Sequence, residues 1–177
     1  MRCILSAEVE KWLTDNLYQV ESERAKVRPA SRFESISIDI PRESSRQAVL
    51  SNLIARLVEQ ASESLIWITA WGIGPSEENW PLFTGLRLLH GERRKLIEAP
   101  GHLFRSEESE ALASLIRLVL AFGWDAHVAT NGGELLVSLS HEEIAEFRSC
   151  SSRMSEVLAM NLKQNDFISL AGATGRV

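Results

Sequence analysis

An acid, a base and two hydroxyl groups recur at alternate positions around an Asn-Gly-Gly segment; they belong to Asp125, His127, Ser138 and Ser140. Residues two apart on a strand project to the same side, so a hairpin places these four side chains on one face. Such a face could support nucleophilic catalysis if a pocket and oxyanion donors accompanied it. A hairpin face supplies no pocket by itself, so the leading interpretation is a polar, water-facing side of the hairpin.

A second group of candidate residues follows a strongly apolar segment, Leu65 to Trp71, that is predicted to be the central strand. Ligands of open α/β sheets bind beyond the carboxyl ends of the strands, and tryptophan is favoured at the centre of protein interfaces. We therefore predict a binding site at this loop edge. Its residues are Trp71, Gly72, Gly74, Glu77, Glu78, Trp80 and, from a predicted Pro100-Gly101-His102 turn, His102. The alternative is that both indoles pack on the core and the glutamates are merely solvated.

Several motif classes that would bind a cofactor or metal are incomplete. Gly72 and Gly74 follow a strand as in a dinucleotide-binding turn, but Glu77 replaces the third glycine, and no phosphate-binding loop motif occurs. His141-Glu142 begins like a zinc-protease helix, but Ala145 stands where the second histidine is needed. No G-x-S-x-G sequence is present. We therefore predict no cofactor and no metal.

Composition favours one globular domain. The chain has 177 residues, of which 45% are hydrophobic and 24% charged, enough to bury a core. Its net charge of −5 argues against binding to nucleic acid, and its single basic run, 93–95, lies between two glutamates and reads as a solvated turn. Cys3 and Cys150 are too few and too far apart for a disulfide scaffold.

Targeting signals are not recognisable in the sequence. The first residues contain no long apolar region, and the longest apolar stretches fall short of the ~20 residues that a membrane-spanning helix needs. We expect a soluble, cytoplasmic protein with no membrane association. The segment 169–177 is small and glycine-containing, and is expected to be a flexible tail.

Apolar periodicity predicts an alternation of helices and strands. The helix beginning near Pro81 is expected to turn Leu82, Phe83, Leu86 and Leu89 inward. In the predicted hairpin, Val128 should pair with Val137 and Ala126 with Leu139, because slipping by one residue would mix polar and apolar groups on both faces. Predicted helices cover 7–20, 49–61, 81–89, 106–122, a segment capped by Ser140 and Glu143, and 154–162; predicted strands cover 33–40, 65–71, 95–98, 124–130 and 134–140.

These elements predict a single layered domain of α/β or α+β class over residues 1–168. We expect a mixed sheet of about four to five strands with helices packed on it, including the hairpin at 124–140. The functional hypothesis is a small, non-catalytic binding or regulatory protein that acts through protein contacts at the loop edge. The alternative is a small hydrolase-like enzyme that uses His102 or His127 with nearby carboxylates. The sequence sets no expectation for the oligomeric state.

Overall fold

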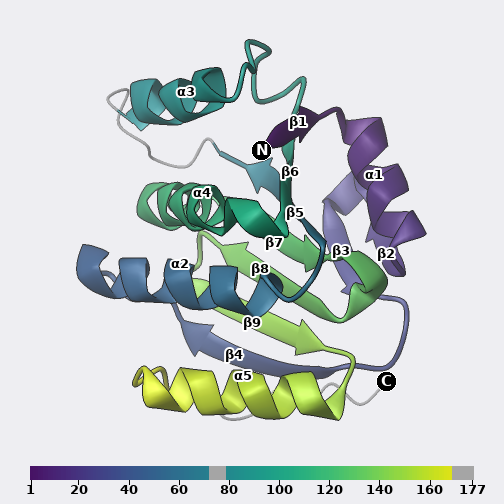
Figure 1. Ribbon diagram of the computed structural model, residues 1–177, viewed down its shortest axis with the longest axis vertical. Helices are drawn as coiled ribbons and strands as arrows, with labels where there is room; N and C mark the ends of the chain where they lie inside the picture. Colours follow the sequence, from purple (N-terminus) through teal and green to yellow (C-terminus); the bar gives the residue numbers. More distant parts are fainter. Residues whose placement is uncertain (72–78, 169–177) are drawn as a thin grey trace.

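A computed structural model describes residues 1–71 and 79–168. A seven-stranded sheet forms the centre of the molecule, with the strand order β1-β6-β5-β7-β8-β9-β4 (Figure 1). Its strands are β1 (Arg2–Ile4), β4 (Glu34–Asp39), β5 (Glu63–Ala70), β6 (Gly101–Arg105), β7 (Asp125–Thr130), β8 (Leu135–Ser140) and β9 (Ile144–Ser149). The layered α+β class is confirmed. The expected strand number and mixed pairing were wrong, because the sheet has seven strands and each neighbouring pair is antiparallel.

Two hydrophobic cores lie on opposite faces of this sheet. One face is covered by four helices: α2 (Ser44–Val58), α3 (Asn79–Leu89), α4 (Ser109–Phe122) and α5 (Ser152–Gln164). The other is covered in part by α1 (Ser6–Asp15) and a two-stranded hairpin, β2 (Tyr18–Glu21) and β3 (Lys26–Pro29). Short 3-10 turns complete the connections at Ser22–Arg24, Ser106–Glu108 and Asn131–Gly133.

The central strand is β5, as its sequence predicts. It pairs with β6 on one side and β7 on the other, and its residues 64–68 are buried. Leu65 and Trp67 pack in the core under α1, whereas Ile66 and Ile68 pack in the core under the helices. A strand whose two faces both pack against a hydrophobic core must be apolar at successive positions. This accounts for the unbroken apolar run in β5.

The predicted hairpin is confirmed in its register. Val128 pairs with Val137, Ala126 with Leu139, and His127 with Ser138. The strand at 33–40 and the helix at 154–162 are confirmed as β4 and α5.

Two predicted helices were wrong in extent or type. The helix expected over 7–20 stops at Asp15, because Leu17 adopts a left-handed backbone (φ 66°) and Tyr18 begins β2. The helix expected after Ser140 is a turn followed by strand β9, with Glu143 at φ 62°. The side chains of β9 alternate between half-buried and buried along 144–149, which is the pattern of a strand with one face on the core.

The chain between α3 and β6 also departs from expectation. Residues 95–98 form a turn and not a strand, and β6 begins at Gly101. A Cβ on Gly101 would lie 2.3 Å from Val9 Cγ2 and 2.7 Å from Ile4 Cγ1. The glycine therefore serves the close packing of α1 on the sheet, and it does not mark the turn that Pro100-Gly101 suggested.

No helix within the described parts of the chain is long and apolar enough to cross a membrane. The segment expected to be a flexible tail, 169–177, lies outside the described residues.

Candidate functional site

Helix α3 lies at one end of the molecule, beyond α4 and far from α5 (Figure 1). Pro81 occupies its first turn, where a missing backbone N–H is tolerated. Gly91 follows its last turn with φ 79°, and its N–H donates to the carbonyl of Leu88. The helix is anchored from one side by Phe83, which is buried against the rings of Trp124 and His102.

The opposite side of α3 is apolar and faces solvent. Leu82 exposes 62% of its surface, Leu88 50% and Leu89 84%, and these three residues surround Gly85 on one helix face. Ile97, in the following turn, is 67% exposed. We call Leu82, Gly85, Leu88 and Leu89 the outer face of α3. The prediction that Leu82 and Leu89 turn inward was wrong.

Arg87, the helix's charged residue, faces inward. Its guanidinium donates to the carbonyls of Ala99 at 3.0 Å and Arg94 at 3.1 Å, and one nitrogen lies 3.4 Å from Nε2 of His102. These bonds tie the turn after α3 to the helix, so the outer face and Ile97 belong to one fixed unit. Burial lowers the pKa of Arg87, but its bonds to carbonyl oxygens replace the lost water.

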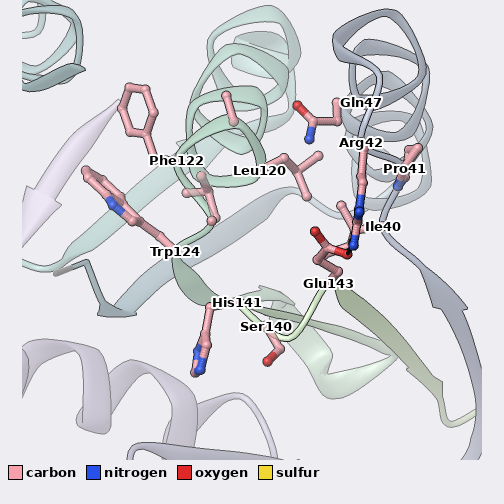
Figure 2. Close-up of a pocket in the computed structure, with 13 residues that line it drawn as sticks. Ile40, Pro41, Arg42, Gln47, Leu120, Phe122, Trp124, Ser140, His141 and Glu143 are labelled. Carbon is pink, nitrogen blue, oxygen red and sulfur yellow. Dashed lines mark hydrogen bonds and ion pairs between the residues drawn. The ribbon is translucent and has the colours of Figure 1, made fainter. Parts of the chain in front are cut away.

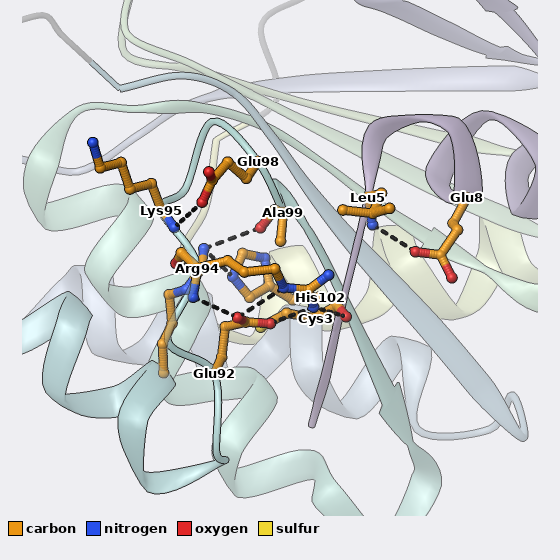
Figure 3. A network of polar contacts seen from close by, with 10 residues as sticks. Cys3, Leu5, Glu8, Glu92, Arg94, Lys95, Glu98, Ala99 and His102 are labelled. Atoms are coloured by element: carbon orange, nitrogen blue, oxygen red, sulfur yellow. Dashed lines mark hydrogen bonds and ion pairs between the residues drawn. The ribbon is translucent and has the colours of Figure 1, made fainter.

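A second polar group locks the same turn (Figure 3). The Glu92 carboxylate accepts from the backbone N–H of Arg94 at 2.7 Å and from its guanidinium at 2.5 Å. The guanidinium also donates to the carbonyl of Cys3, which joins the turn to β1. The hydrogen bond from the Arg94 side chain holds the pKa of Glu92 at about 2, against an ordinary 4.5. The basic run is thus partly a structural anchor, with Arg93 and Lys95 left exposed.

Of the predicted loop-edge residues, Trp71 and Trp80 lie within the described chain and are half-buried. The Trp80 ring is 5.7 Å from the Trp124 ring and 6.4 Å from Phe83, so it packs on the helix-side core. Gly72, Gly74, Glu77 and Glu78 lie outside the described residues. The carboxyl-end rule that selected this edge applies to parallel sheets, and the antiparallel pairing of β5 removes that support.

His102 lies in strand β6 and is fully buried. Because Arg87 can only donate, Nε2 of His102 accepts, and the proton of the neutral ring resides on Nδ1. Within the described chain, Nδ1 forms no hydrogen bond of ordinary geometry. Burial, aided by the charge of Arg87, lowers the pKa of His102 to about 3. The imidazole is therefore neutral at pH 7, and the surrounding core shields it from solvent.

The four residues predicted to share the hairpin face, Asp125, His127, Ser138 and Ser140, do not form one hydrogen-bonded group. Nδ1 of His127 lies 3.0 Å from the hydroxyl of Ser138, and its Nε2 lies 2.9 Å from the carbonyl of Ala25. Asp125 instead accepts from the backbone N–H of His141 at 2.6 Å and from its Nδ1 at 2.8 Å. The acid therefore orients His141 and does not orient His127. Ser140 accepts from the backbone N–H of Glu142.

The face is covered by the β2–β3 hairpin at His127 and Ser138, so its interpretation as a water-facing surface was wrong for this pair, whereas the hydrogen bonds of Asp125 and Ser140 lie at its exposed end. The carbonyl of Ala25 can only accept, so Nε2 of His127 carries the proton and Nδ1 accepts from the Ser138 hydroxyl. Arg148 donates to the carbonyl of Val27 at 3.2 Å and lies 3.4 Å from the Ser138 hydroxyl. These bonds dock the β2–β3 hairpin on the sheet. Burial lowers the pKa of His127, and the charge of Arg148 adds to this.

A half-open pocket of about 360 Å³ lies between the start of α2, the end of α4 and the β8–β9 turn (Figure 2). Arg42 and Glu143 both line it and contact each other: the Arg42 guanidinium donates two hydrogen bonds, of 2.8 and 3.0 Å, to the Glu143 carboxylate. His141 points away from this pair. The charged groups at the pocket are thus already paired with each other or with Asp125, and in the described chain no cluster of His, Cys, Asp or Glu could hold a metal.

Comparison with known proteins gives no match: no family model, no curated protein and no solved structure is significantly similar to this chain. The functional interpretation therefore depends on the geometry of the chain itself.

Proposed function

We propose that this protein is a cytosolic, non-catalytic binding protein that contacts another protein through the outer face of α3. The observation that carries the proposal is the inverted arrangement of the helix: its arginine is buried, and three of its four leucines, Leu82, Leu88 and Leu89, are exposed. Soluble proteins rarely leave a contiguous apolar patch exposed, so a patch of this kind indicates an interaction site. The proposal moves the predicted contact from the tryptophans to the leucines that follow them in the chain.

The way α3 is held supports this role. Arg87 fixes the turn after the helix through two carbonyls, and Phe83 packs between His102 and Trp124. A surface that is already rigid loses little conformational entropy when a partner binds. The Trp80 ring, packed on Trp124, gives the first turn of the helix similar support.

The test is site-specific photo-crosslinking in cells that make the protein. A photoreactive residue replaces Leu89, and the control replaces Met160, which is also an exposed apolar residue but lies on α5 at the other end of the molecule. The expected result is a protein adduct from position 89 that is absent from position 160 and is lost when Leu82→Asp is added. Absence of any adduct at position 89, or an equal adduct at both positions, would refute the proposal.

A second candidate function comes from the His127–Ser138 hydrogen bond. A neutral imidazole that accepts a serine proton, while a carbonyl holds its other nitrogen, is the arrangement that activates a serine nucleophile. Arg148 lies beside the same hydroxyl. A fluorophosphonate probe tests this candidate: the docking role described above predicts no labelling, and labelling that Ser138→Ala abolishes would establish a hydrolase-type serine.

A further inference from the structure

The apolar outer face of α3 borders a cationic segment of the chain. Gly91 ends the helix, and Arg93 and Lys95 follow in the connection to β6, where both side chains are exposed. Arg93 follows Leu89 by four positions, so their Cα atoms lie at most about 14 Å apart. A segment that covers the leucines and extends past this end of α3 therefore meets these two charges.

The chain itself does not neutralise these two cations. The neighbouring Arg94 is paired with the Glu92 carboxylate, but neither Arg93 nor Lys95 forms an ion pair with another described residue. Glu98 accepts from the backbone N–H of Lys95, and the Lys95 side chain extends away from that carboxylate (Figure 3). Two unpaired cations beside exposed leucines are a local exception in a chain whose net charge is −5.

The chemistry of a complementary partner follows from this arrangement. Leu82 and Leu89, two turns apart, give the outer face one straight apolar stripe, which matches the apolar stripe of another helix. At Gly85, within the stripe, an added Cβ would meet no atom within 4 Å, so the centre of the face is open. We propose that the partner of the outer face is a helix of another protein that presents an apolar stripe and carries carboxylates at the end beside Arg93 and Lys95.

The polarity of the two helices determines which end of the partner is acidic. Opposed helix dipoles attract, so the partner runs antiparallel to α3 and its N-terminus lies beside the two cations. Carboxylates are also favoured in the first turn of any helix, because the N-terminal end of the dipole is positive. The partner segment therefore has an acidic first turn followed by apolar residues at helical spacing. This inference rests on the proposed function, since it names the kind of partner that binds the same surface.

The test is fluorescence anisotropy of two synthetic peptides of about 18 residues, titrated with the purified full chain up to about 500 µM. The acidic peptide has glutamates in its first turn and a leucine stripe. The basic peptide has the same leucines, with lysines in place of the glutamates. We expect the acidic peptide to bind at least about ten-fold more tightly, because favourable charge contacts replace unfavourable ones, and we expect added salt to reduce the difference.

Variants of the full chain separate the charge contacts from the apolar contact. Arg93→Glu with Lys95→Glu should reverse the preference, so that the basic peptide binds more tightly. The matched control, Arg153→Glu with Lys163→Glu, changes the net charge equally on α5 at the other end of the molecule and should leave the preference unchanged. Leu89→Asp should abolish binding of the acidic peptide. Each variant must keep the wild-type unfolding midpoint.

Equal binding of the two peptides, or a preference that Arg93→Glu with Lys95→Glu does not reverse, would overturn the inference. Sedimentation with vesicles of phosphatidylserine and phosphatidylcholine tests a lipid surface, which usually requires a cluster of about 4–8 cations. Binding to these vesicles without a peptide preference would also overturn the inference. So would a dimer of the chain that Leu89→Asp abolishes, if no peptide preference accompanies it.

The cellular crosslink at position 89 separates this inference from the proposed function. An adduct at position 89, with no preference for the acidic peptide, overturns the inference and leaves the proposed function standing. Absence of the adduct removes both.

Discussion

Tyr18→Phe tests how the small hairpin is joined to the sheet. The Tyr18 hydroxyl is buried where β7 and β8 separate, 2.8 Å from the carbonyl of Leu135 and 2.9 Å from that of Thr130. It also accepts from the backbone N–H of Thr130 at 3.2 Å. The substitution removes one donated bond and leaves this N–H without its hydroxyl partner.

The expected loss of stability follows from these hydrogen bonds. A buried polar group left unsatisfied costs about 1–3 kcal/mol. For a chain of this length that corresponds to a fall in Tm of about 2–12 °C. Urea denaturation, followed by tryptophan fluorescence, measures the change in the free energy of unfolding. A loss below about 0.5 kcal/mol would refute the role given to the hydroxyl.

The ionisation of Tyr18 gives an independent check on the same residue. Burial raises its pKa from 10.0 to about 12. Between these values the unfolded chain releases the proton and the folded chain keeps it, so this stabilisation is present below pH 10 and is lost as the pH rises towards 12. The chain has one tyrosine, so absorbance at about 295 nm reports this group alone. Titration of the folded protein near pH 10 would contradict the buried position.

Three further predictions concern other parts of the fold. Gly101→Ala should cost about 1–3 kcal/mol in urea denaturation because the new methyl group meets Val9, and Val9→Ala in the same chain should restore part of the loss; unchanged stability would contradict the packing of α1. Glu92→Gln should flatten the acid dependence of the unfolding midpoint, since the stability from this carboxylate is present above pH 4.5 and lost as the pH falls towards 2; an unaltered pH profile would count against the ion pair. A thiol reagent at neutral pH should modify Cys150 in the folded protein but spare Cys3, which is buried with its pKa raised to about 11; mass spectrometry would detect native modification of Cys3, the contrary result.

Strands flanked by clear turn signals could be predicted from the sequence alone. The register of β7 and β8 followed from matching apolar residues across the Asn-Gly-Gly turn, and β5 followed from a run that is apolar on both sides, as a strand covered on both faces requires. Strand β9 was missed because Ser140 and Glu143 have the spacing of a capping box. The alternation of Ala145 and Phe147 with polar neighbours was the competing signal, and burial of those two side chains under the helices decided the outcome.

The outer face of α3 could not be predicted, for a physical reason. Helical spacing shows which residues share a face, but it does not show which face meets the core when both faces are apolar. Arg87 turns inward, on the same side as Phe83, because its guanidinium reaches the carbonyls of Ala99 and Arg94. These carbonyls belong to the turn after α3, which only the folded chain brings near the helix.

In the cell, we expect a protein partner to cover the outer face of α3. Hydroxyl-radical footprinting of the chain, compared between intact cells and dilute purified protein, measures this directly. We predict that Leu82, Leu88 and Leu89 are oxidised less in cells, while oxidation of Met160 changes little. Equal oxidation of the three leucines in both states would contradict the account.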